Sequence, residues 1–392
     1  MLANVVVVGA GPAGSATALA LARRGIDVQL VERAVFPRPK VCGEYLNIGA
    51  VRLLDELGVG AAVRAVASPL RGVRLVSAKV DPVVLPFPGE ALALAREQLD
   101  LILLDAARAA GARVQRGRVE DLVFEGDRVS GVSVRNEAGE RHSIAARFVV
   151  GADGVGSLVA RKMGVVRASG GPRRFAVGGH YDGFSGLDQH VEMHVAPGTY
   201  FAINPLDSRR ANVMIVVRDR ALSAWAGAVD SGVSALAAKL GCGRRSFEGT
   251  QRIGERLSIG PLAFDVSAVA RPGALLVGDA AGFLNPFTGQ GVYLALRSAQ
   301  DAAMALLAAL ERPELEPHAL AQYSHERTHD VRARRRLAWL TGMLIDVPWM
   351  AARAASRVAR SPELAEHLLA ALGGATAREQ PLSPLLAARL LA

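Results

Sequence analysis

The chain has 392 residues, 51% of them hydrophobic, so it is long enough for two domains and apolar enough to build a large core. Its net charge of +9 comes mainly from arginines scattered along the chain, and this scatter argues against a nucleic-acid-binding protein. The two cysteines, Cys42 and Cys242, lie far apart, which fits a reduced cytoplasmic protein better than a disulfide scaffold.

The first recognisable element is a buried strand that turns into a helix, in "NVVVVGAGPAGSATALALA". The β-branched run predicts a strand buried on both faces, and Gly9, Gly11 and Gly14 follow it with G-x-G-x-x-G spacing. In this pattern the first glycine permits the turn, the second lets the backbone approach a pyrophosphate, and the third allows close helix–strand packing. Pro12 and Ala13 begin the helix, whose free N–H groups favour an anion.

A second strand, "DVQLVER", ends in Glu32 and Arg33. An acidic residue at this distance from the glycines suits a ribose hydroxyl and indicates a dinucleotide site. A signal peptide is disfavoured because no basic region precedes the apolar run. A transmembrane segment is disfavoured because glycines and a proline interrupt a barely sufficient length. We therefore expect no transmembrane segment.

Further along the chain, an amphipathic helix beginning at Arg96 leads through three predicted strands to "GADG", which contains Asp153 and Gly154. Short alternating strands in 172–260 predict a separate antiparallel sheet. The chain then returns to a strand, a glycine-rich loop and a long helix in "GALLVGDAAGFLNPFTGQG", and it is helical from about residue 313. The expected organisation is a discontinuous nucleotide domain (1–70, 96–170 and 262–312), a substrate domain (71–95 and 171–261) and a helical C-terminal region (313–392).

Two other segments were weighed for function. His190, Glu192 and His194 alternate along one strand, and we expect them to face solvent, because nothing else has metal-ligand spacing; no metal site is predicted. The segment 332–352 joins an arginine cluster to an apolar stretch that contains Asp346 and Pro348. It is interpreted as a docked helix with a solvated basic face, or alternatively as a peripheral membrane contact.

Three separated motifs, "GAGPAG", "GADG" and "GDAAGFLNPFTGQG", resemble those of FAD-dependent oxidoreductases of the aromatic-hydroxylase and geranylgeranyl-reductase superfamily. The resemblance covers roughly residues 1–310. It implies an α/β fold with a Rossmann-like FAD-binding domain of the glutathione-reductase type, an inserted antiparallel substrate sheet and a helical C-terminus. It also implies FAD as cofactor.

The resemblance assigns parts of FAD to particular residues. The N-terminal loop would hold the pyrophosphate, Glu32 the adenosine ribose and the Val119 backbone the adenine, while Arg96 and Asp153 would lie near the cofactor. Asp279 would bind the ribityl chain or the neighbouring pyrophosphate, and the helix after Gly289 and Gly291 would stabilise negative charge on the reduced flavin. The other residues expected to contact FAD are Arg33, Cys42, Gly43, Gly154, Gly278 and Pro286.

No second complete G-x-G-x-x-G occurs, so NADH or NADPH would bind only transiently, or a partner protein would donate the electrons. "FPRPKVCGE" satisfies the Pro-x-x-x-x-Cys-Gly pattern of geranylgeranyl reductases and related flavoproteins, which place Cys42 and Gly43 beside the isoalloxazine. Cys42 is either a small structural residue or a redox- or substrate-contacting one. The strand "TYFAINP" keeps Tyr200 and Pro205 of the isoprenoid reductases, but Ala202 replaces their tryptophan.

Three functions stay open from the sequence, and no catalytic residue is assigned. The favoured one is an FAD-dependent monooxygenase that hydroxylates an apolar, aromatic or polyketide-like small molecule of secondary metabolism. The first alternative is a geranylgeranyl-reductase-like reductase or dehydrogenase acting on C=C bonds of a lipophilic substrate, with Glu44 and Tyr45 as conceivable proton donors. The second is a flavin-binding or electron-transfer protein without turnover. Halogenation is disfavoured because the Trp-x-Trp-x-Ile-Pro motif is absent.

Overall fold

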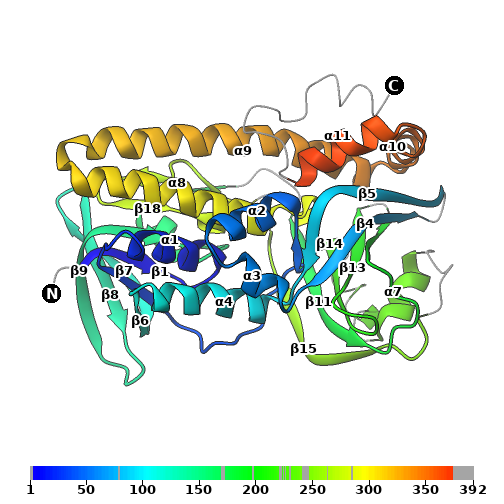
Figure 1. Cartoon of the computed structure of the whole chain (residues 1–392), viewed down its shortest axis with the longest axis horizontal. Coiled ribbons are helices and arrows are strands. Elements are labelled where there is room, and N and C mark those ends of the chain that lie inside the picture. The colour runs from blue at the N-terminus through cyan, green and yellow to red at the C-terminus, as the bar shows by residue number, and fades with distance from the viewer. Residues whose placement is uncertain are drawn as a thin grey trace.

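The computed structural model describes residues 3–77, 80–168, 173–196, 198–219, 223, 225, 227–228, 231–240, 247–262, 264–283 and 286–373. Within these ranges the chain forms two large mixed sheets and a set of helices, shown from N-terminus to C-terminus in Figure 1. The predicted α/β fold, with a nucleotide-binding sheet, a largely antiparallel second sheet and C-terminal helices, is confirmed.

The first sheet is parallel at its centre, in the order β17-β18-β9-β1-β2-β6. Its strands are β1 (Ala3–Val8), β2 (Val28–Glu32), β6 (Arg113–Arg116), β9 (Arg141–Gly151), β17 (Ala270–Arg271) and β18 (Ala274–Leu276). Strand β1 pairs in parallel with both β2 and β9, and β18 pairs in parallel with β9. The carboxyl ends of β1, β9 and β18 therefore meet at one edge, where the three glycine motifs follow them.

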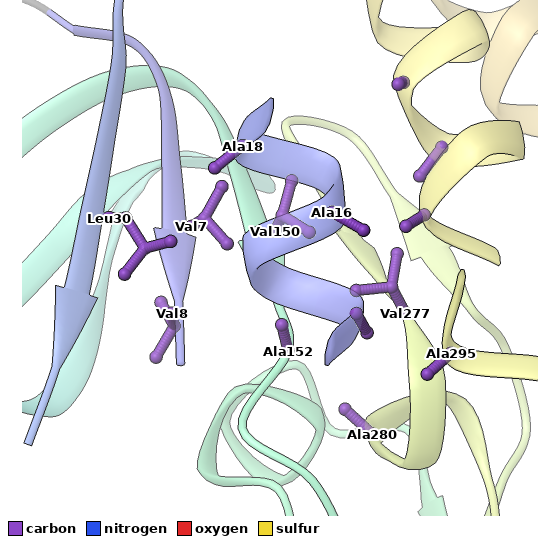
Figure 2. Close-up of a cluster of buried hydrophobic side chains, with 14 of the residues drawn as sticks. Val7, Val8, Ala16, Ala18, Leu30, Val150, Ala152, Val277, Ala280 and Ala295 are labelled. Carbon is purple, nitrogen blue, oxygen red and sulfur yellow. The ribbon is translucent and has the colours of Figure 1, made fainter. Parts of the chain in front are cut away.

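Helix α1 (Pro12–Ala22) packs between α4 (Arg96–Ala109) and α8 (Gly291–Glu311). Its small side chains make this possible: Figure 2 shows Ala16 and Ala18 of α1 among side chains of the strands, with Val277, which follows β18, and Ala295 of α8 close by. Because almost every residue of α1 is buried, the helix has no solvated face, and its composition reflects burial rather than membrane insertion.

A meander of β7 (Arg118–Glu125), β8 (Arg128–Arg135) and β9 lies beside the parallel sheet and leads into α5 (Leu158–Lys162). A small ladder joins β10 (Val166–Arg167) to β16 (Asp265–Val266). Strands β7, β8 and β9 match the three strands that the sequence predicts before "GADG".

The second sheet has the order β15-β11-β14-β13-β12-β4-β5-β3. Its strands are β3 (Tyr45–Leu46), β4 (Ser68–Ser77), β5 (Val80–Ala93), β11 (Arg174–Asp182), β12 (His190–Ala196), β13 (Thr199–Pro205), β14 (Ala211–Arg218) and β15 (Gln251–Ile259). One face of β11, β13 and β14 packs on α7 (Val233–Leu240), and the other carries a separate apolar cluster. The short strand β3 ties the segment after Cys42 to this sheet.

The remaining helices frame both sheets. They are α2 (Ile48–Glu56), α3 (Gly60–Arg64), α9 (Glu316–Asp346), α10 (Pro348–Arg360), α11 (Pro362–Gly373) and the short 3-10 turns Gly278–Ala281, Pro286–Thr288 and Pro313–Leu315. Helix α9 runs alongside α8, and α10 and α11 cover β5, as Figure 1 shows. None of the helices in the described ranges combines the length and apolar character of a membrane span. Residues 374–392 of the predicted C-terminal region lie outside those ranges.

Candidate functional site

The N-terminal glycine turn is determined by close backbone contacts. Gly9 has φ +100°, and a Cβ added there would lie 2.7 Å from the Ala152 carbonyl oxygen. A Cβ on Gly14 would lie 1.8 Å from the Gly9 carbonyl oxygen. Both positions therefore require glycine for the fold itself, the first for its backbone angle and the second for helix–strand packing.

Glu32 does more than the sequence predicts. Its carboxylate accepts hydrogen bonds from the backbone N–H of Ala10, at 2.7 Å, and of Ala34, at 2.8 Å. The side chain is buried at the end of β2 and links that strand to the glycine turn. A carboxylate has about four acceptor positions, so capacity remains for the ribose hydroxyl that the resemblance implies.

The third motif meets the first. A Cβ on Gly278 would lie 2.8 Å from the Ala13 side chain, and the Gly278 N–H donates to the Ser298 hydroxyl of α8 at 2.8 Å. Asp279 follows directly. Burial raises the pKa of its carboxyl group, while Arg96, Lys40 and Arg327 act against this rise. The loops that the sequence separates by most of the chain thus lie side by side.

Several cationic side chains lie near Lys40 and Asp279. Burial lowers the pKa of Lys40, and repulsion by Arg38, Arg96 and Arg33 lowers it further, while Asp279 opposes the change. Four cationic side chains in such proximity favour an anion between them. The motifs in the sequence point to Arg33 and Arg96 but not to Arg38 and Lys40, although both stand in "FPRPKVCGE" beside Cys42.

Arg96 is held by an aspartate that the sequence analysis did not identify. Its Nε and Nη2 donate to the two carboxylate oxygens of Asp100, each at 2.8 Å, and both side chains are buried. Arg38 reaches the same carboxylate at 3.5 Å. The i,i+4 spacing on α4 was a detectable signal for the Arg96–Asp100 pair. Asp100 therefore fixes the positions of Arg96 and Arg38, two of the four cationic side chains described above.

The Cys42–Gly43–Glu44 turn is fixed to the second sheet. The Asn212 side chain donates to the Cys42 carbonyl oxygen at 3.1 Å, and the Asn204 side chain donates to that of Gly43 at 2.9 Å. Burial raises the pKa of the Cys42 thiol, although Arg96 beside it acts in the opposite direction. A raised pKa keeps the thiol protonated at neutral pH, which favours a structural role over a nucleophilic one. Cys242 lies outside the described residues.

The loop before α8 closes the other side of this turn. Pro286 begins a 3-10 turn, and Gly289 has φ +63°, where an added Cβ would lie 2.7 Å from the Tyr45 ring. Asn47 donates to the Gly289 carbonyl oxygen at 3.4 Å. Helix α8 then starts at Gly291, and the side chain of its N-cap residue, Gln290, makes no capping hydrogen bond. The partial positive charge of a helix N-terminus favours a negatively charged group.

Some glycines of the site are required neither by close neighbours nor by their backbone angles, and these positions test whether FAD fits. A Cβ on Gly43 or Gly291 would meet no described atom within 4 Å, and one on Gly11 would meet only Arg38 Nη2, at 3.8 Å. None of the three is in the left-handed region, so neither neighbours nor backbone angles require glycine there. Together with the cationic side chains, these open positions fit an extended dinucleotide that approaches the backbone closely.

The other predicted cofactor residues have clear places. Asp153 accepts hydrogen bonds from the N–H of Leu158, at 2.6 Å, and of Val159, at 3.2 Å, so its carboxylate caps α5. Gly154 follows it with φ +77°. Val119 is buried at the start of β7, beside the end of β2, and Arg33 is exposed. Contact of these residues with FAD stays a prediction.

The expectation that Glu192 and His194 face solvent is wrong. Their exposed fractions are 3% and 2%, and the His194 ring stacks on Phe201 with centroids 4.2 Å apart. The two residues do share one face, but this face of the sheet is the one that α7 covers. Among the described residues no cluster of His, Cys, Asp or Glu is suited to a metal ion.

The opposite face of the second sheet is apolar where it faces the Cys42 turn. Its buried members and the residues packed against them include Ala176, Tyr200, Met214, Val216, Val41 and Phe287. The Tyr200 and Phe287 rings meet edge to face, with centroids 5.0 Å apart. The buried Tyr200 hydroxyl has no hydrogen-bond partner among the described residues. This face therefore offers an apolar surface that contains a buried hydroxyl without a partner among the described residues.

Comparison with known proteins agrees with this geometry. A family model described as an FAD binding domain matches residues 3–337. The menaquinone reductase of Mycobacterium tuberculosis (strain ATCC 25618 / H37Rv) is 33% identical over 319 residues, covering 77% of this chain and 76% of the relative. The digeranylgeranylglycerophospholipid reductase 2 of Methanopyrus kandleri is 30% identical over 339 residues, covering 82% and 81%. A solved flavin-dependent brominase, 20% identical, superposes with a TM-score of 0.85 over 95% of this chain and 94% of its own.

Proposed function

Because this chain belongs to the FAD binding domain family of oxidoreductases, we propose that it is an FAD-dependent reductase that adds hydrogen across a C=C bond of a lipophilic, isoprenoid-bearing molecule. The curated relatives described above are named reductases of menaquinone and of digeranylgeranylglycerophospholipid. Both names denote lipophilic molecules with isoprenoid chains. The motifs alone favour hydroxylation. The sequence identity of these reductases to this chain supports placing reduction ahead of it.

The observation that carries the proposal is the position of the Cys42–Gly43 turn against an apolar sheet face. Asn204 and Asn212 hold the turn, and Tyr200, Met214 and Val216 of the same strands supply the apolar surface. A substrate that packed on this face would lie beside the turn that family resemblance assigns to the isoalloxazine. Such a surface excludes water and favours a hydrocarbon chain.

When bound, FAD supplies hydride chemistry. Asp100 fixes Arg96 and Arg38, which would bind the cofactor's anionic part, and Glu32 fixes the glycine turn. The N-terminus of α8 provides positive potential for charge on the reduced ring. NADH or NADPH would act as a transient external reductant.

The test is an anaerobic reaction of the photoreduced holoenzyme with a polyprenyl quinone or a geranylgeranyl lipid. Reoxidation of the flavin, together with a product that has gained two hydrogens, would support reduction. The matched experiment mixes the reduced holoenzyme with oxygen and the same lipid. A long-lived oxygenated flavin absorbance and a product that has gained oxygen would instead establish hydroxylation and overturn the proposal.

Hydroxylation is the second candidate because of one substitution. Ala202 stands where isoprenoid reductases carry tryptophan, between Met193 and Met214 in the register of the sheet. The smaller side chain leaves room on the apolar face for an aromatic ring. An aromatic substrate would then replace the isoprenoid chain, and the oxygen experiment above would identify it.

Access of a lipophilic substrate raises the question of membrane contact. The segment 332–352 is helical, in α9 and α10, and the side chains of most of its residues lie outside the described part of the structure. We propose that it makes peripheral contact with a lipid surface. Co-sedimentation with anionic vesicles tests this, and failure to bind vesicles of any charge would contradict it.

A further inference from the structure

Glu44 joins the two sheets through one carboxylate. Its Oε1 accepts a hydrogen bond from the backbone N–H of Arg96, at 3.0 Å, and its Oε2 lies 2.8 Å from His180 Nε2. Arg96 begins α4, which packs on α1 of the first sheet's nucleotide-binding unit, whereas His180 lies on β11 of the second sheet. Glu44 is 3% exposed. The carboxylate therefore bridges two parts of the fold at a buried point.

The backbone at Glu44 is unusual. Its φ is +57°, and it is the one non-glycine residue in the left-handed region among the described residues. This conformation costs a non-glycine residue free energy and persists only where surrounding contacts enforce it. The contacts here are those of the carboxylate, the bond from the Glu44 N–H to the Cys42 sulfur at 3.3 Å, and the bond from the Leu94 N–H to the Glu44 carbonyl oxygen at 3.0 Å.

His180 belongs to a row of side chains that hold consecutive residues of one turn. His180 pairs in register with Asn212, which holds Cys42, and Asn204 holds Gly43. His180 completes the row by binding Glu44. A Cβ on Gly43 would meet open space, so the held turn presents bare backbone toward the site. Its position decides how closely that backbone can approach a flat ring.

The charges around His180 favour its protonated form. The hydrogen bond to Glu44 raises the pKa of the His180 ring, and this effect outweighs the opposing effect of burial. The charge of Glu44 itself and that of Glu97 also raise the pKa, and Arg210 lowers it. A protonated ring beside a buried carboxylate makes a charge-assisted bond, which is stronger than a neutral one.

We propose that Glu44 and His180 are positioning residues whose ion pair holds the Cys42–Gly43 turn against the flavin ring, so that loss of the His180 proton loosens cofactor binding. This inference rests on the proposed function only for the place of the flavin beside Gly43. It is independent of which substrate is reduced. Neither residue is required to touch the reacting atoms.

The first test follows the His180 ring by proton–nitrogen NMR of the histidines in the holoenzyme, assigned by loss of its signal in His180→Gln. We expect a pKa above the ordinary value of about 6.5. In Glu44→Gln the pKa should fall back toward that value. A ring that titrates at or below the ordinary value in the unmodified protein would overturn the proposal.

The second test measures the dissociation constant of FAD by flavin fluorescence across the pH range in which His180 titrates. We expect binding to weaken by about tenfold as pH rises through the pKa of His180. His180→Gln should bind FAD weakly at every pH, and the exposed-residue control His318→Gln should keep the wild-type profile. A His180→Gln profile that superposes on wild type would refute the ion pair's role.

Both tests are independent of turnover. No substrate enters the NMR or binding measurements, so either can fail while the proposed reduction stands. Conversely, a holoenzyme that reduces no double bond but shows the expected pH-dependent FAD affinity would refute the proposed reaction and leave the positioning role intact.

Discussion

Gly278 lies directly against Ala13, so close that a Cβ on Gly278 would come within 2.8 Å of the Ala13 side chain. This contact joins the 3-10 turn that carries Asp279 to the first turn of α1. One extended cofactor can therefore touch both motifs. Gly278 is required for two reasons: this contact leaves no room for a Cβ, and its φ of +58° is unfavourable for other residues.

Gly278→Ala should destabilise the protein by about 3 kcal/mol, because strain at positive φ adds to the clash with Ala13. The matched control is Gly126→Ala. Gly126 has the same φ of +58° but open space where its Cβ would lie, so it should cost only about 1 kcal/mol. Urea unfolding of the two variants measures the difference. Equal losses would show that the contact with α1 contributes nothing.

Gly11 and Gly14 should respond oppositely to the same substitution. Gly11→Ala should keep the fold and lose FAD, because its Cβ meets no described atom closer than 3.8 Å and would enter the space of the pyrophosphate. Gly14→Ala should fail to fold, because its Cβ would lie 1.8 Å from a carbonyl oxygen. Circular dichroism and bound-flavin absorbance separate the two effects. A folded Gly11→Ala protein with full flavin content would contradict the pyrophosphate assignment.

Asp100→Asn should both destabilise the protein and weaken FAD binding. The substitution leaves the buried Arg96 guanidinium without its charged partner and releases Arg38. Breaking a buried ion pair costs about 3 kcal/mol. Unfolding measurements and FAD titration test the two effects together, with the exposed pair variant Asp105→Asn as control, since Arg108 and Asp105 are both largely exposed. Unchanged FAD affinity would show that the two arginines do not depend on Asp100 for their orientation.

The parts of the site that sequence predicts are those set by local backbone geometry. Gly9 and Gly14 follow a buried strand and open a helix, and this order alone constrains their backbone. The family resemblance implies Gly278 and Gly289, and both have positive φ in the structure. Such positions can be found because the strand–turn–helix unit is contiguous in the chain.

The contacts that the sequence does not predict join distant segments of the chain. Glu44 meets His180 only because β11 lies beside the turn after Cys42, and no spacing in the sequence indicates that neighbour. His194 alternates with hydrophobic residues as an exposed strand residue would, yet the helix α7, from later in the chain, covers its face. Alternation identifies a shared face but not what packs on it.

Two of the buried tyrosines, Tyr200 and Tyr323, offer the sharpest test of where the substrate lies. The Tyr200 hydroxyl has no partner among the described residues, whereas the Tyr323 hydroxyl donates to the Leu276 carbonyl oxygen at 2.5 Å. Tyr200→Phe should therefore leave the free energy of unfolding unchanged or raise it slightly, because it removes an unpaired buried polar group. Tyr323→Phe should lower it by about 1 kcal/mol.

The same two variants should also differ in their KM for the substrate. If the substrate's polar group binds the Tyr200 hydroxyl, Tyr200→Phe should raise KM by about tenfold with unchanged FAD affinity, since one hydrogen bond is worth about 1 kcal/mol or more. Tyr323→Phe should leave KM unchanged, because its hydroxyl serves the strand before Asp279 and lies apart from the apolar face. Equal KM values for Tyr200→Phe and the unmodified protein would place the substrate's polar group elsewhere, while a loss of stability in Tyr200→Phe would reveal a structural partner for this hydroxyl.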